Sequence, residues 1–106
     1  MAVTEITSET QLENTLQTNA KVAAHFVTSW SAPCRTISPV FEKLSEQYKD
    51  VVCVKLDIDN VPAVAHQYSV STTPTFIMLR NGEKSDDLIG ANPVALEDKI
   101  KALAEA

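Results

Sequence analysis

The chain has 106 residues, of which 44% are hydrophobic and 22% are charged, and its formal net charge at pH 7 is −5. This length predicts one folded domain, residues 1–106, with a single hydrophobic core, and the composition differs from that of a disordered chain. The negative charge argues against nucleic acids and anionic membranes as partners.

The first elements alternate between strand and helix. The segment "VTEI" (3–6) predicts a short strand. Ser8, with Gln11 three residues later, is typical of a capping box at the start of a helix, and Leu12 and Leu16 would lie on one face of it. The apolar segment "KVAAHFV" that follows, residues 21–27 of the chain, predicts a strand buried on both faces.

The next helix is indicated by an apolar stripe. Ile37, Phe41, Leu44 and Tyr48 recur at helical spacing and would face the core. Pro39 lies inside this stripe and has no N–H group to donate, so we expect a kink near it.

The middle of the chain predicts a strand, a short helix and another strand. The segment 51–58 ("VVCVKLDI") predicts a second buried strand, in which Cys53 packs as a small hydrophobic residue. Asn60 is a candidate cap for a short helix that carries Val64 and Tyr68. The segment "TFIMLR" then predicts the next strand.

A hairpin and a helix complete the predicted domain. Asn-Gly at 81–82 predicts a tight turn, so the acidic segment 84–90 would be an antiparallel strand at a sheet edge. Asn92 and Pro93 are typical of a helix cap and first turn. The core-facing residues of this last helix would be Leu96, Ile100 and Leu103.

The segment "SWSAPC" lies between the predicted strand 21–27 and the proline-interrupted helix. A strand, then Trp-x-x-Pro-Cys, then such a helix resembles the thioredoxin family. Trp30 precedes the site as in that family. Pro33 and Cys34 match the end of its Cys-Gly-Pro-Cys site, with Ala32 for the glycine and Ser31 for the first cysteine.

The resemblance covers the whole chain. Thr73 and Pro74 match the dipeptide whose cis proline lies against the active site of the family. Pro39 matches its helix-kinking proline, the "RNGE" segment its hairpin, and Gly90 a glycine of its last strand. The resemblance implies an α/β thioredoxin fold, a central mixed sheet of about five strands with helices on both faces.

Ser31 changes the chemistry that the family motif implies. In the family, a first thiol at the helix start attacks a substrate disulfide, and a second thiol resolves the mixed disulfide. The Ser31 hydroxyl is hardly ionised at neutral pH, so we expect the first step to be lost. Cys34, one turn further into the helix and less exposed, is left as a resolving-type thiol, open to mixed-disulfide formation or oxidation, or simply packed in the helix.

Two further positions depart from the family pattern. His25 stands where active members carry a buried aspartate that accepts the proton of the second thiol, and Val27 replaces a common tryptophan. A His-Phe pair ahead of a single thiol is similar to the thioredoxin-like N-terminal domain of multidomain monothiol glutaredoxins. It is also similar to monothiol thioredoxin-like proteins of plants, which keep the first cysteine.

Two functions follow from these resemblances. The first is a docking module of thiol–disulfide redox homeostasis, redox-inactive or monothiol, with a covalently linked glutaredoxin domain as one partner. Protein partners would bind as an extended peptide in a groove formed by Trp30, Ala32, Pro33, Thr73 and Pro74. The alternative is a protein-disulfide reductase in which serine replaces the nucleophilic cysteine, naturally or by engineering. Neither function requires a metal or another cofactor.

Other arrangements are weaker. Ser31 and His25 could form a nucleophile–base pair, but the sequence offers no oxyanion loop and no third group for it. His25, Cys34 and His66 lack the spacing of zinc ligands. Lys55 and Asp57 would either form an ion pair or mark the end of a strand.

The sequence also gives an expectation for the compartment. Two cysteines are too few for a disulfide framework, which favours a reducing compartment, the cytosol or the nucleus. No apolar run is long enough to cross a bilayer, and no secretory signal peptide is recognised, so we expect no membrane partner.

Overall fold

The computed structural model describes residues 2–106. Within them the strands are β1 (Val3–Ile6), β2 (Lys21–Val27), β3 (Val52–Asp57), β4 (Thr75–Arg80) and β5 (Glu83–Ile89), and the helices are α1 (Glu9–Thr18), α2 (Ala32–Gln47), α3 (Pro62–Gln67) and α4 (Pro93–Glu105). The predicted order of elements is confirmed. In this described part of the chain, none of the helices has the length and apolar character needed to cross a membrane.

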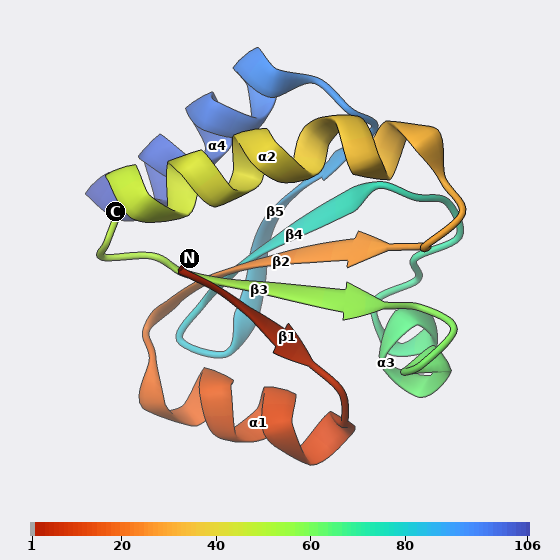
Figure 1. Ribbon diagram of the computed structural model, residues 1–106. Coiled ribbons are helices and arrows are strands. Elements are labelled where there is room, and N and C mark those ends of the chain that lie inside the picture. Colours follow the sequence, from red (N-terminus) through yellow and green to blue (C-terminus); the bar gives the residue numbers. More distant parts are fainter. Residues whose placement is uncertain (1) are drawn as a thin grey trace.

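The strands form one mixed sheet in the order β1-β3-β2-β4-β5. β1, β3 and β2 run parallel to one another, whereas β4 and β5 pair antiparallel. Helices α2 and α4 cover one face of the sheet, and α1 and α3 cover the other (Figure 1). The fold predicted from the sequence, a mixed sheet with helices on both faces, is therefore confirmed.

The core lies in two layers because side chains alternate along each strand. On β2, Val22, Ala24 and Phe26 belong to the cluster beneath α1 and α3, and Ala23 belongs to the cluster beneath α2 and α4. The second cluster also contains Ile37, Phe41, Leu44, Cys53, Phe76, Met78, Leu96, Ile100 and Leu103. The predicted stripes of α2 and α4 are thus core residues, and Cys53 is the small buried residue that we expected.

The predicted cap of α1 is half confirmed. Ser8 is its N-cap, and its hydroxyl accepts a hydrogen bond from the Gln11 backbone N–H at 3.1 Å. The return bond of a capping box is absent, since Gln11 Oε1 accepts from Thr7 N instead, at 2.9 Å. Gln11 Nε2 donates to the Glu5 carbonyl at 2.9 Å, so this side chain ties the helix start to the end of β1.

Some element boundaries differ from the sequence prediction. The N-cap of α3 is Val61, with no side-chain cap bond, rather than Asn60. Pro62 takes the first helical position, where its missing N–H is harmless, and this moves the cap to Val61. Tyr48 is the C-cap of α2, and its half-buried side chain still packs against the core cluster beneath α2 and α4, as the predicted stripe implies. The strand predicted over 51–58 is shorter by one residue at each end.

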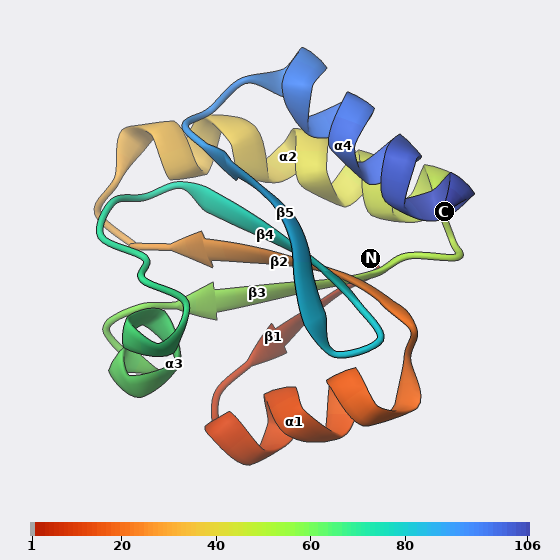
Figure 2. The same ribbon diagram turned by 180° about the vertical axis from the view of Figure 1, so that it is seen from behind.

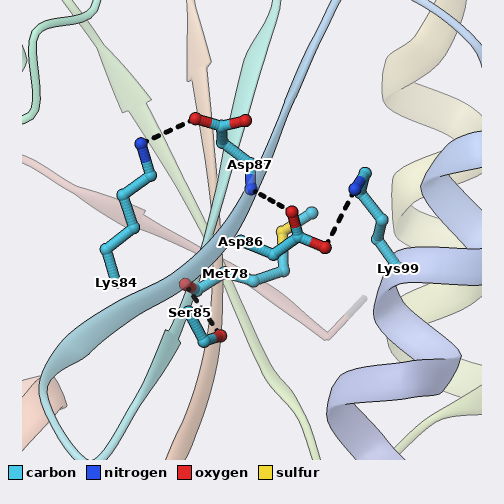
Figure 3. A network of polar contacts seen from close by, with 6 residues as sticks. All are labelled: Met78, Lys84, Ser85, Asp86, Asp87 and Lys99. Carbon is cyan, nitrogen blue, oxygen red and sulfur yellow. Dashed lines mark hydrogen bonds and ion pairs between the residues drawn. The ribbon is translucent and has the colours of Figure 1, made fainter.

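Strand β5 is an edge strand, as predicted, and Figure 2 shows it from its exposed side. Asn81 and Gly82 both have positive φ, 54° and 82°, as a tight hairpin turn requires. Figure 3 shows the polar contacts that hold this edge. Ser85 lies at a bulge and donates to the Met78 carbonyl at 3.3 Å, and Lys99 of α4 pairs with Asp86 at 2.8 Å. β5 is therefore bound to α4 as well as to β4.

Candidate functional site

The topology brings two loops together at one end of the sheet. β2 and β4 are antiparallel neighbours, and Phe26 near the end of β2 pairs with Thr75 at the start of β4. The loop 28–31 that leads into α2 therefore lies beside the segment 71–74 that leads into β4. The Thr73–Pro74 peptide bond is cis, as the resemblance predicted.

Ser31 is the N-cap of α2. Its hydroxyl accepts a hydrogen bond from the Cys34 backbone N–H, with the two heavy atoms 3.4 Å apart. Ser31 is 7% exposed and Cys34 is 3% exposed, so the deeper position of Cys34 is confirmed. The position that receives the favourable field of the helix start thus holds a hydroxyl, and the thiol lies one turn away in the protein interior.

A pair of hydroxyl groups links the two loops. Thr28 Oγ1 and Thr73 Oγ1 lie 3.0 Å apart, and Thr28 is buried. Thr73 was predicted as a site residue from the family resemblance, whereas no motif pointed to Thr28. No sequence pattern pairs these two threonines, because their proximity depends on the register between β2 and β4.

Exposed apolar side chains surround this end of the sheet. Trp30 is 74% exposed, and Ala32 and Pro33 are also exposed. Ile89 at the end of β5 is 70% exposed, and the Gly90 N–H that follows it donates to the Pro74 carbonyl at 2.9 Å. We call Trp30, Pro33, Thr73 and Ile89 the Trp30 surface. Ile89 was missed because only strand pairing places it beside Thr75.

His25 lies under α2 in a fully buried position, with 0% of its surface exposed. Its ring stacks on Phe76 at a centroid distance of 4.2 Å and meets the edge of Phe41 at 5.2 Å. Neither ring nitrogen has a hydrogen-bond partner within residues 2–106. Burial, followed by the positive charge of Lys55, lowers the pKa of His25 from 6.5 to about 3. The imidazole is therefore neutral at physiological pH.

A cavity of about 180 Å³ adjoins this histidine, and it lies between α2 and the strands β1, β2 and β3. Its lining comprises Val3, Glu5, His25, Ser38, Phe41, Glu42 and Lys55. Lys55 is the β3 neighbour of His25. Lys55 and Asp57 form neither of the two ion pairs found in the described chain, and Asp57 instead accepts from the Asp59 N–H at 2.9 Å. Of the two predicted roles, an ion pair or the end of a strand, Asp57 takes the second, because it is the last residue of β3.

The remaining sequence candidates are not brought into a joint site. His25 and Ser31 share no hydrogen bond, so the structure gives them no nucleophile–base contact. His66 is exposed on α3, and no group of three metal-binding side chains occurs within residues 2–106. Cys53 is 1% exposed, and burial raises the pKa of its thiol to about 12. This thiol is therefore inert at neutral pH.

Comparison with protein families gives a match over nearly the whole chain. Residues 3–102 match the family described as Thioredoxin. Thioredoxin H5 of Oryza sativa is 38% identical over 105 residues, which are 95% of this chain and 78% of that protein. Thioredoxin-2 of Pyricularia oryzae is 36% identical over 102 residues. That match covers 96% of this chain but only 60% of the length of the relative.

Solved structures give the same similarity in three dimensions. Mitochondrial thioredoxin 3 of Saccharomyces cerevisiae, in its oxidised form, superposes with a TM-score of 0.91 at 38% sequence identity. The superposition covers 95% of each chain. The fold of this chain is thus shared with a thioredoxin along nearly the whole domain.

Proposed function

Because this chain belongs to the thioredoxin family, we propose that it is a thioredoxin-type thiol–disulfide redox protein in which Ser31 occupies the position of the attacking cysteine. The observation that carries the proposal is the place of Ser31. It caps α2 beside the cis Thr73–Pro74 bond, with Cys34 one turn further along the helix. This is where a thioredoxin-type reductase needs its first thiol.

The missing thiol defines what the site can do. In the complete reaction, a thiolate at position 31 attacks one sulfur of a substrate disulfide, forms a mixed disulfide and releases one substrate thiolate. The Cys34 thiol then loses its proton and attacks the sulfur at position 31, which releases the second substrate thiol. The substrate gains two electrons and two protons, and the protein is left with a disulfide. Ser31 cannot begin this sequence, so the unmodified chain binds without turnover.

The Trp30 surface is the proposed binding site for a protein partner. Among the backbone hydrogen bonds outside helices and strands in residues 2–106, none involves Thr73. Its N–H and C=O are therefore available to an extended peptide, which would pair with them as an added strand. The exposed side chains of Trp30 and Ile89 would contact the apolar side chains of such a peptide.

A docking module without redox turnover is the second candidate function. The serine at position 31 favours it, because the start of α2 then carries no thiol that could begin exchange, while the exposed Trp30 surface remains available for binding. A covalently linked glutaredoxin domain belongs to this candidate. The genomic reading frame distinguishes the two, since it records both a downstream domain and the codon at position 31.

We propose a reducing compartment, the cytosol or the nucleus, as the location. Cys34 and Cys53 lie in different elements, α2 and β3, and are not joined to each other. Free thiols of this kind persist where glutathione and thioredoxin keep them reduced.

Insulin reduction with dithiothreitol as electron donor tests the proposed reductase. We expect no catalysis above the dithiothreitol background from the unmodified chain, and measurable turnover from Ser31→Cys. Adding His25→Asp should raise the rate further, because the carboxylate would accept the Cys34 proton in the second step. Circular dichroism confirms the fold of each variant. Turnover by the unmodified chain, or none by Ser31→Cys, would refute the proposal.

A further inference from the structure

One pair of side chains joins the loop before α2 to the segment before β4. The Thr28 and Thr73 hydroxyl oxygens lie 3.0 Å apart. No other side-chain hydrogen bond within residues 2–106 connects the segments 28–31 and 71–74. Thr28 is 3% exposed and Thr73 is half-buried, so solvent competes little for this bond. In the described part of the chain, the pair is therefore the one side-chain hydrogen bond that directly joins these two segments.

The two partners are held unequally. Thr28 follows β2 directly, and its carbonyl accepts from the Ser31 N–H at 3.3 Å. The Val27 carbonyl beside it accepts from the Ile58 N–H at 3.0 Å, so this side is anchored in the sheet. Thr73 has no such backbone bond of its own in the described chain, and its hydroxyl makes its only hydrogen bond to Thr28. It is held otherwise only through its neighbours, since the Thr72 carbonyl accepts from Thr75 Oγ1 at 2.7 Å and the Pro74 carbonyl from the Gly90 N–H at 2.9 Å.

We propose that Thr28 and Thr73 form a positioning pair, which holds the Thr73 backbone in place relative to Ser31 and Cys34. This rests on the proposed function, in which an extended peptide pairs with Thr73. Without the bond, Thr73 gains freedom that a bound peptide must remove, so peptide binding weakens. A hydrogen bond of this kind corresponds to about a two- to tenfold change in an equilibrium constant. The exchange of sulfur bonds after binding does not involve the pair, so its rate stays the same.

The binding arm of the test uses the chain with Ser31 in place. Trp30 is the only tryptophan and is 74% exposed, so its fluorescence reports peptide binding at the site. The probe is the S-alkylated B chain of insulin. We expect Thr28→Val and Thr73→Val each to raise its Kd by about two- to tenfold. The double variant should match the single ones, because both remove the same bond.

Two kinds of control separate positioning from general damage. Thr28→Ser and Thr73→Ser keep the hydroxyls and should restore the original Kd. Thr72→Val removes a neighbouring hydroxyl, and it should change nothing, since Thr72 contributes only its carbonyl, which accepts from Thr75 at 2.7 Å. Additive effects of the two valine changes, an equal loss in Thr72→Val, or no peptide binding by the unmodified chain would each overturn the proposal.

The kinetic arm distinguishes this proposal from the proposed function. In the Ser31→Cys background, Thr73→Val should raise the KM for insulin by the same factor and leave kcat unchanged. The rate at which this double variant reduces a small aromatic disulfide should also equal that of Ser31→Cys alone, because such a substrate needs no strand pairing. A fall in kcat at constant KM would overturn the positioning role. If Ser31→Cys itself shows no turnover, the reductase proposal fails, and the Trp30 titration alone decides between a coupled pair and independent threonines.

Discussion

The chemistry of this site depends on which groups occupy three positions. Ser31 caps α2, Cys34 lies buried one turn later, and His25 lies buried beneath the same helix, where the family resemblance leads us to expect a carboxylate. The charge that each position favours is set by its surroundings. The helix start favours an anion that a hydroxyl does not supply, and burial keeps His25 neutral. Under the proposed function, these three positions form the frame of a dithiol site without its nucleophile.

Thiol labelling should separate the two cysteines. We predict that native Cys34 reacts with iodoacetamide at least about tenfold faster than Cys53. Cys34 lies in the first turn of α2, which local opening exposes. Cys53 lies in β3 between two neighbouring strands, and the pKa of its thiol is raised to about 12. Peptide mapping after timed labelling gives both rates, and equal rates would contradict this assignment.

The buried histidine should make stability fall in acid. The pKa of His25 is about 3 in the folded protein against 6.5 ordinarily, so below pH 6.5 the unfolded chain binds a proton that the folded chain does not. Between pH 7 and pH 5 this removes about 2 kcal/mol from the free energy of unfolding. The stability is fully present above pH 6.5 and is lost as the pH falls toward 3.

Urea denaturation at several pH values measures this loss. His25→Asn should flatten the profile between pH 7 and pH 5, whereas His66→Asn, at an exposed histidine on α3, should leave it unchanged. An identical slope in the unmodified chain and the His25 variant would show that the buried imidazole is not the titrating group.

The helices differ in how their ends are held. Asn92 caps α4, since its side-chain oxygen accepts from the Ala95 N–H at 3.1 Å. Asn60 was predicted to cap α3 on the same grounds of residue type, but Val61 takes that place. The competing signal was Pro62, which fixes the first helical residue more strongly than asparagine fixes the cap. The sequence contains both the asparagine and the proline signal, and the proline signal is the stronger of the two.

Alanine substitutions at these two asparagines form a matched pair that tests the helix caps. Asn92→Ala should lower the free energy of unfolding by about 1 kcal/mol, because it leaves N–H groups of α4 without their side-chain acceptor. Asn60→Ala should change it by less than about 0.5 kcal/mol, since Asn60 makes only a backbone contact with Asp57. Chemical denaturation measures both. A larger cost at Asn60 would mean that the cap of α3 is wrongly assigned.

For the whole molecule, the sequence predicted what local patterns control. Apolar strands, amphipathic helices and the Asn81–Gly82 turn determined the order of elements, and the family motifs located Ser31, Cys34 and Pro74. It did not predict contacts that depend on register between distant strands. Thr28 reaches Thr73, and Ile89 lies beside Thr75, only once β2, β4 and β5 are paired. The register between β2 and β3 likewise places Lys55 beside His25.

We propose that the chain is a thioredoxin-type fold whose attacking thiol is missing at Ser31. The most direct measurement is intact mass spectrometry of the covalent complex formed with insulin. The variant Ser31→Cys, Cys34→Ser should retain insulin as a mixed disulfide, because a thiol at position 31 can attack but nothing resolves the bond. Dithiothreitol should release it. The unmodified chain should form no such complex. Equal trapping by the unmodified chain through Cys34, or none by the double variant, would show that position 31 is not the place of the attacking thiol.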